Sequence, residues 1–220
     1  MVPPAEDRAE RAERILDAAA ELLLRAGYRR TTVEDVAERA GVGKGTVYLH
    51  WKNREELFLA VLLRESVRSL EDLVAALEAD PLAVGLARLT AIQYANVLGR
   101  PLLRAGYADD AGTLGKLLPK LHTKLDPRHQ EAFVDYLELL AANDLLRADR
   151  PARELAVAYQ AVLHGFLRAA HPPELIADTV AHAFEPAALS TRQLRAVAPR
   201  VLELFTESVA LDRKQIERAY

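Results

Sequence analysis

Apolar residues in this 220-residue chain recur every three or four positions, and this helical period limits the fold more than any other feature. The first long instance places Ile15, Ala18, Ala19, Leu22 and Leu23 on one face of a helix. Leu and Ala dominate the apolar residues, and no stretch alternates apolar and polar residues as a half-buried strand would. We therefore expect an all-α fold.

Turn residues divide the N-terminal part of the chain into three helices. Gly27 ends the first helix. Thr31 or Thr32 can cap the second helix, because each has an acidic residue three positions later. The second helix ends at the glycines of residues 41–43, and the third runs from about residue 44 to residue 51. Two short helices joined by a glycine-bearing turn predict a helix-turn-helix.

A long fourth helix begins without a linker at Asn53, which is followed three residues later by Glu56 as another capping signature. We therefore expect a helix-turn-helix domain in residues 1–52, which this helix joins to a helical ligand-binding and dimerisation domain in residues 53–220. The further helices that we predict cover residues 82–98, 113–124, a stretch that starts at 127, and residues 151–170, 174–184 and 191–211.

Charge is distributed unevenly along the chain. The formal net charge is −3, yet four basic residues and no acidic residue lie between Arg39 and Arg54. A short basic stripe in a near-neutral protein suits a compact DNA-binding element on a larger body. The chain has no cysteine, which excludes disulfides and thiolate metal sites. Because no segment has the pattern of a signal peptide or of a membrane span, we expect a cytoplasmic protein without a membrane contact or a cofactor.

Candidate catalytic groups are weak. Asp109 and Asp110 fit a turn better than a pair of catalytic carboxylates. Residues 41–46 lack the spacer and the preceding strand of a phosphate-binding loop, and His122 and His129 lack the spacing of a metal-binding pair. Two alternatives stay open at this point: an all-α carrier or enzyme for an apolar ligand without DNA-binding activity, and a DNA-binding activator that lacks a ligand.

The segment from Thr32 to Leu57 closely resembles the DNA-binding segment of the TetR family of bacterial regulators. Its apolar positions, its turn glycine, Tyr48 and the run from Lys52 to Leu57 are all in register with that family, over roughly the first quarter of the chain. The resemblance implies a regulator rather than an enzyme. It also implies a ligand-responsive repressor that binds palindromic double-stranded DNA as a homodimer and is released by a small effector.

The third helix carries the candidate DNA contacts. Val47 is its main apolar anchor, so the opposite face is free to meet DNA. In the TetR family, the positions that commonly contact DNA match Thr32, Lys44, Tyr48, His50 and Lys52 of this chain. The residues that we expect to meet base edges are Lys44, Gly45, Thr46 and Leu49. Taken alone, Lys52 fits a solvated charge and Tyr48 a core aromatic equally well. We interpret Trp51 as structural.

An uncharged helix predicts a homodimer. The 13 residues from Leu155 to Leu167 carry no charge, so this helix needs cover on more than one face, and a second subunit can supply it. A central core helix in a monomer is the alternative. In the resembling family, the last two long helices pair across a two-fold axis. The interface residues that we expect are Tyr159, Val162, Leu163, Gly165, Phe166, Val201, Leu204 and Phe205.

Polar residues scattered over the apolar helices of the body are candidates for an effector site, because ligand sites are mostly apolar with a few polar groups. The family resemblance implies such a site in the helices around residues 82–170. The residues that we expect to line it are Tyr94, Tyr107, His122, Tyr136 and Tyr159. Each tyrosine alone also fits a core position. We expect a hydrophobic or aromatic effector rather than a sugar phosphate or a metal ion.

Overall fold

A computed structural model describes residues 8–108, 110, 112–117, 120, 127–147, 149–169 and 171–217. Helices account for the regular structure in this part of the chain, and no strand forms in it, which confirms the all-α prediction. The elements are α1 (Arg8–Ala26), α2 (Val33–Ala40), α3 (Lys44–His50), α4 (Arg54–Ala79), the short 3₁₀ helix η1 (Pro81–Val84), α5 (Leu86–Leu98), α6 (Pro101–Tyr107), α8 (Pro127–Ala141), α9 (Ala152–Ala169), α10 (Pro173–Phe184) and α11 (Thr191–Glu217).

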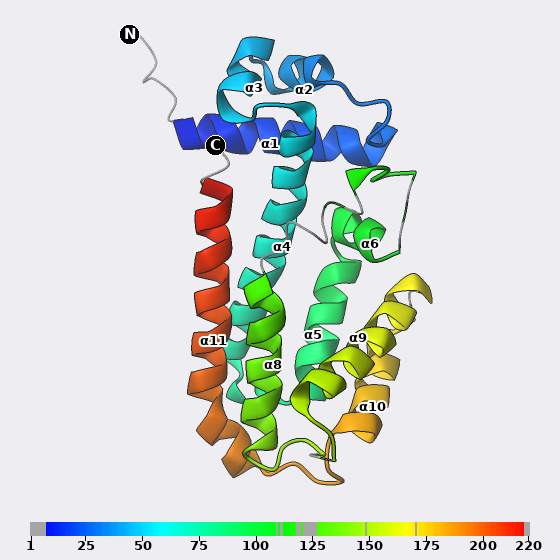
Figure 1. Ribbon diagram of the computed structural model, residues 1–220, viewed down its shortest axis with the longest axis vertical. Coiled ribbons are helices and arrows are strands. Elements are labelled where there is room, and N and C mark those ends of the chain that lie inside the picture. The colour runs from blue at the N-terminus through cyan, green and yellow to red at the C-terminus, as the bar shows by residue number, and fades with distance from the viewer. Residues whose placement is uncertain are drawn as a thin grey trace.

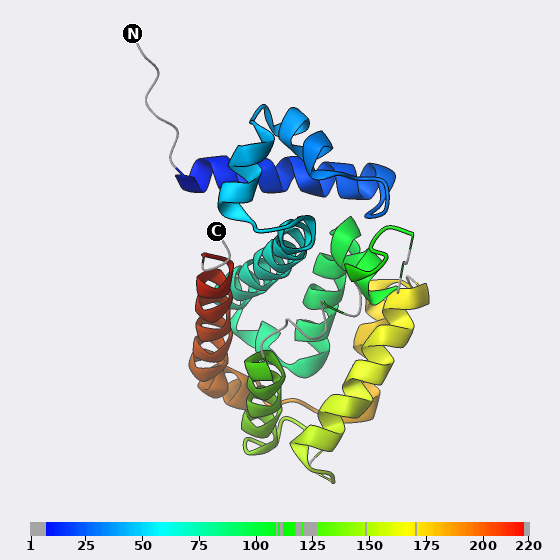
Figure 2. The same ribbon diagram turned by 45° about the horizontal axis from the view of Figure 1, so that its top comes forward.

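The helices form a small head and a longer body. The head consists of α1, α2 and α3, which lie across one end of the molecule (Figure 1). The helix α4 leaves the head directly and runs down the body, where α11 packs along it in the opposite direction (Figures 1 and 2). In the body α10 packs against α5, and α8 contacts both α9 and α11. Because no linker precedes α4, this helix connects the head to the body mechanically.

Caps fix the boundaries of the head helices. Gly27 follows α1 with φ +74°, a left-handed conformation that glycine adopts without strain. Of the two possible caps for α2, the structure forms the one at Thr32, whose side chain accepts a hydrogen bond from the Asp35 amide. Asn53 caps α4 by accepting a hydrogen bond from the Glu56 amide at 2.9 Å. These local signals confirm the predicted helix starts.

The segment after α5 departs from the sequence prediction. Residues 101–107 form the short helix α6, which begins at Pro101, although the sequence indicated a broken stretch there. Proline fits the first turn of a helix because the missing N–H has no intrahelical partner at that position. Residues 112–116 form turns rather than the predicted start of a helix, because the Asp110 carboxylate accepts hydrogen bonds from the backbone of Gly112 and Thr113. Much of the predicted helix 113–124 lies outside the described residues.

The hydrophobic core of the head extends into the body. It combines α1–α3 with the start of α4, residues 57–62, and with Leu102, Ala105, Leu114 and Leu117. Leu114 and Leu117 have no exposed surface. The domain boundary that we predicted at residue 52 therefore crosses one continuous core. In the described part of the chain, no helix combines the length and the apolar content needed to cross a bilayer.

Candidate nucleic-acid interface

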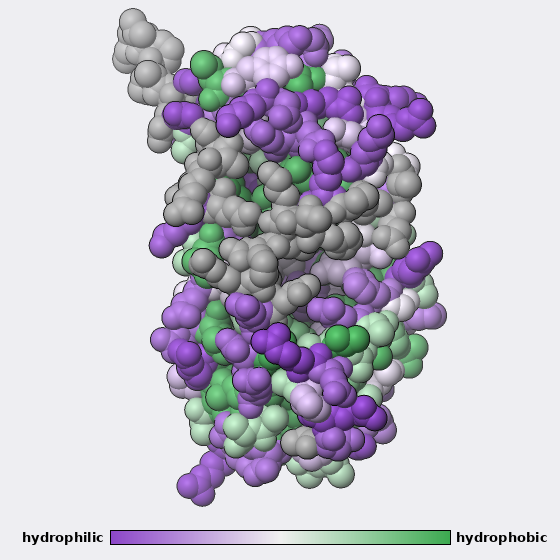
Figure 3. All heavy atoms as spheres, in the orientation of Figure 1, coloured by the Kyte–Doolittle hydropathy of each residue, from purple (hydrophilic) through white to green (hydrophobic). Residues whose placement is uncertain are grey.

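Two buried residues hold α3 against the head. Val47 and Trp51 are each 1% exposed, which confirms that both are core residues. Their burial turns the opposite face outward: Leu49 is 74% and Tyr48 43% exposed. Lys44 and Gly45 are also exposed, and Thr46 is partly so. In Figure 3 hydrophilic residues cover most of the head, with small apolar spots among them. The α3 surface is thus a polar strip with one projecting leucine.

His50 lies under this strip rather than on it. Its side chain is buried, and its ring lies 5.2 Å from the Trp51 ring, centre to centre. Burial lowers the pKa of His50, and the positive charges of Arg8 and Arg11 lower it further. A neutral, buried imidazole offers no charge to a phosphate. Because His50 is buried in this conformation, the contact expected from the sequence is not available to DNA.

Thr32 is exposed, but its polar groups are already engaged. Its hydroxyl and its amide donate to the same Asp35 carboxylate oxygen at 2.7 Å and 2.8 Å. These hydrogen bonds lower the pKa of Asp35. A phosphate would therefore have to compete with Asp35 for the Thr32 donors.

The basic residues near α3 differ in their partners. Lys44 forms an ion pair with Glu34 of α2 and lies over the Tyr48 ring, 5.7 Å from its centre. Arg39 forms an ion pair with Glu21 of α1 at 2.6 Å. Lys52 is exposed, and no described residue pairs with its ammonium group. The stretch from Arg39 to Arg54 contains no acidic residue, but acidic residues of other helices partly neutralise its basic side chains.

A known family shares this head. The model of the family described as "Bacterial regulatory proteins, tetR family" matches residues 15–61, which span the end of α1, all of α2 and α3, and the start of α4. The head of the chain belongs to the TetR family. The chain therefore carries the DNA-binding helix-turn-helix of a family of transcriptional regulators rather than enzymes.

Relatives and solved structures extend the likeness beyond the head. The uncharacterized HTH-type transcriptional regulator YvkB of Bacillus subtilis is 26% identical over 157 residues, which cover 70% of this chain and 79% of YvkB. Seven further curated relatives match over 51 to 98 residues, less than half of their own length.

Two solved structures share the fold over most of the chain. A SmeT–triclosan complex has a TM-score of 0.63 and 21% identity, covering 81% of this chain and 93% of that one. FadR from Bacillus subtilis in complex with stearoyl-CoA has a TM-score of 0.55 and 18% identity, covering 89% and 98%.

The candidate effector residues in the body of this chain are mostly packed in its core. Tyr136 is fully buried and donates to the Val84 carbonyl at 2.9 Å. Tyr94 is also fully buried and donates to the His171 carbonyl at 2.7 Å. The hydroxyls of Tyr159 and Thr90 are 3.1 Å apart, and burial raises the pKa of Tyr159 to about 12. These three tyrosines therefore already have partners within the chain.

Tyr107 differs from the other three tyrosines. It is half-buried, its ring lies 5.5 Å from the His164 ring, centre to centre, and no described residue hydrogen-bonds to its hydroxyl. His122 lies outside the described residues. Two hollows formed by described residues lie elsewhere: one of about 840 Å³ between the head and residues 115–116, and one of about 220 Å³ between α8 and α11. Neither is lined by the predicted tyrosines.

The expected dimer residues divide by burial. The chain's own core covers Tyr159, Val201, Leu204 and Phe205, so these side chains do not form an outer surface. Val162, Leu163 and Phe166 are half-buried against the same core. Sequence periodicity could not tell the inner from the outer face, because α9 is apolar on both. Moreover, α8 lies between α9 and α11, so these two helices are not paired side by side within one chain (Figure 1).

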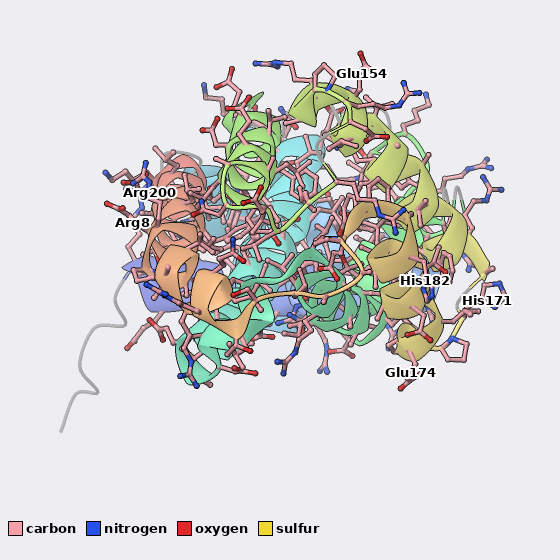
Figure 4. The ribbon with its side chains drawn as sticks, turned by 90° about the horizontal axis from the view of Figure 1, so that it is seen from below. Arg8, Glu154, His171, Glu174, His182 and Arg200 are labelled. Carbon is pink, nitrogen blue, oxygen red and sulfur yellow. The ribbon has the colours of Figure 1, made fainter. Side chains whose placement is uncertain are left out.

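The outer face of α9 carries exposed small and apolar residues, with Val157 68% exposed. Of this face the sequence predicted only Gly165 for the dimer and missed the other residues. A side chain built at Gly165 would meet nothing within 4 Å. Viewed from below, Glu154 at the start of α9 and Glu174 on α10 point away from the body (Figure 4). The residues that form this outer face are Val157, Ala158, Ala161, His164 and Gly165.

Proposed function

We propose that this regulator is a repressor that binds a palindromic operator as a homodimer and is released by a small, hydrophobic or aromatic effector. The exposed strip of α3 carries the proposal. It presents side chains that can donate hydrogen bonds or pack against bases, and buried Val47 and Trp51 hold it in place. A helix presented in this way fits the major groove of B-DNA.

The residues of the strip divide into two roles. Lys44, Gly45, Thr46 and Leu49 lie on the exposed or partly exposed surface of α3 and are assigned to base edges. Tyr48, Lys52 and Thr32 are also exposed and are assigned to the phosphate backbone. Lys52 needs no change of partner to contact a phosphate, whereas Thr32 must first release Asp35.

The outer face of α9 is assigned to the homodimer. The uncharged stretch from Leu155 to Leu167, with Val157 68% exposed, leaves apolar surface in water unless another chain covers it. Small residues and Gly165 allow the backbones of two helices to approach closely. A second copy is the natural occupant, because two helix-turn-helix units on one palindrome are related by a two-fold axis.

The effector is assigned to the body between α5, α6 and α9. The neighbouring core is apolar, and the Tyr107 hydroxyl, to which no described residue hydrogen-bonds, supplies one hydrogen-bonding group. The SmeT and FadR structures hold triclosan and stearoyl-CoA, respectively, which supports an apolar effector here. Because Tyr136 and Tyr159 are packed in this conformation, the effector would favour a more open one.

Two connections can carry the effect of the ligand to the head. The first is α4, where buried Arg64 pairs with Glu13 at 3.0 Å and with Asp17 at 2.9 Å, both on α1. The second is the docking segment, residues 112–117, whose leucines lie in the core of the head. A shift of either element changes the separation of the two α3 helices in the dimer.

Selection of bound fragments from the source genome tests the DNA half of the proposal. The expected result is a palindrome whose half-sites lie about one helical turn, 34–36 Å, apart. A reporter gene behind that palindrome should be silenced by the protein and restored by at least one compound from a broad apolar panel. Absence of an enriched palindrome would refute the DNA assignment, and activation of the reporter would refute the repressor role.

A further inference from the structure

An acidic residue lies at the edge of the proposed DNA-binding strip. Glu34, on the first turn of α2, forms an ion pair with Lys44, the first residue of α3. Both side chains face water, with 58% of Glu34 and 49% of Lys44 exposed. The pair is thus open to the same solvent from which DNA would approach.

The cap of α2 does not need an acidic residue at position 34. Asp35, not Glu34, completes the capping box with Thr32. The Glu34 carboxylate instead interacts with Lys44, and this interaction is the largest cause of the lowered pKa of Glu34. The structural alternative is that Glu34 stabilises α2 through the helix dipole, as any acidic residue in a first turn does. Glu38, one turn later on the same helix, has no ion pair with a described residue.

We propose that Glu34 holds Lys44 in the free protein and so lowers affinity for DNA of arbitrary sequence. The inference rests on the proposed DNA contact of Lys44. Glu34 and a phosphate compete for the same ammonium group.

The competition lowers affinity for arbitrary DNA. Nonspecific binding comes from phosphate contacts, so a lysine that is held by an acid is lost from it. An exposed ion pair is weak, however, so DNA can still open it. The Tyr48 ring beneath Lys44 keeps the ammonium near the strip when the pair opens.

The test compares Glu34→Gln with the control Glu38→Gln, which removes the same charge from the same helix. Full-length proteins are titrated into a fluorescent duplex of mixed sequence, about 30 base pairs long, at about 50 to 200 mM NaCl. Glu34→Gln should tighten binding about threefold to tenfold at low salt and make the slope of log K against log salt steeper by about one contact. Glu38→Gln should change binding less than about twofold.

Lys44→Ala provides the second arm. If the gain passes through Lys44, adding Glu34→Gln to Lys44→Ala should leave affinity within about twofold of Lys44→Ala alone. Equal gains from Glu34→Gln and Glu38→Gln, a gain that persists without Lys44, or no gain would each overturn the inference. A wild-type chain that does not bind the duplex at any salt would overturn the proposed function itself, which separates the two failures.

Discussion

Replacing Gly27 by alanine tests whether the head is held to the body at the docking segment. Gly27 ends α1 at φ +74°. A Cβ at this position would lie 2.5 Å from the Gly112 carbonyl oxygen, closer than folded proteins allow. The neighbouring Tyr28 amide donates to the Thr113 carbonyl at 2.8 Å. An added methyl group would therefore clash with the Gly112 backbone, which the neighbouring hydrogen bond between Tyr28 and Thr113 holds in place.

Gly41 supplies the matched control. It also ends a helix of the head, at φ +66°, but a Cβ there would meet nothing within 4 Å. Gly41→Ala should therefore cost only the left-handed backbone strain, about 1 kcal/mol. Gly27→Ala adds displacement of packed backbone, about 1–3 kcal/mol, so its total should be about 2–4 kcal/mol.

Urea unfolding of the full chain, followed by circular dichroism, measures both variants. Gly27→Ala should lower the unfolding free energy by at least about 1 kcal/mol more than Gly41→Ala. It should also weaken the coupling between effector and DNA, because the docking segment is pushed off the head. Equal losses for the two variants would refute the idea that the segment is tightly docked.

Three further changes test other parts of the structure. Gly165→Leu should shift sedimentation toward monomer by overpacking the α9 face, whereas Arg153→Leu in the exposed first turn of α9 should not; a dimer unaffected by the first would refute this face. Lys52→Ala should weaken operator and arbitrary DNA alike, whereas Thr46→Ala should mainly relax sequence preference; equal patterns in binding assays would show that these roles are wrongly assigned. Burial raises the pKa of Glu185, so the wild type should lose stability as pH rises through that pKa. Glu185→Gln should be the more stable protein in melts near neutral pH and lose this advantage toward pH 4.5, and a constant difference would contradict the assignment.

Local signals in the sequence predicted the helices well. The Asn53 cap and the Gly27 stop depend on residues within one turn, so their spacing alone places them. The short α6 carries too few residues for a periodic pattern, and only Pro101 hinted at its start. The family resemblance came from the same local segment and holds over the head.

Contacts between helices could not be predicted in this way. His50 is buried and lies near the charges of Arg8 and Arg11 only in the folded head, and Glu34 reaches Lys44 only once α2 packs beside α3. The outer face of α9 is distinguished from its inner face only by which side the body covers. In each case the deciding residue is distant in the sequence, and no spacing rule connects the two.

The central claim, that an effector and DNA exclude one another through the body, is tested most directly by reciprocal calorimetry. The recovered palindrome is titrated into the protein with and without a compound that relieves repression, and the compound is titrated with and without the palindrome. Thermodynamic linkage predicts that each weakens the other by the same factor, about 5- to 150-fold, a coupling of about 1–3 kcal/mol. A compound that binds the body and leaves palindrome affinity unchanged would contradict the account.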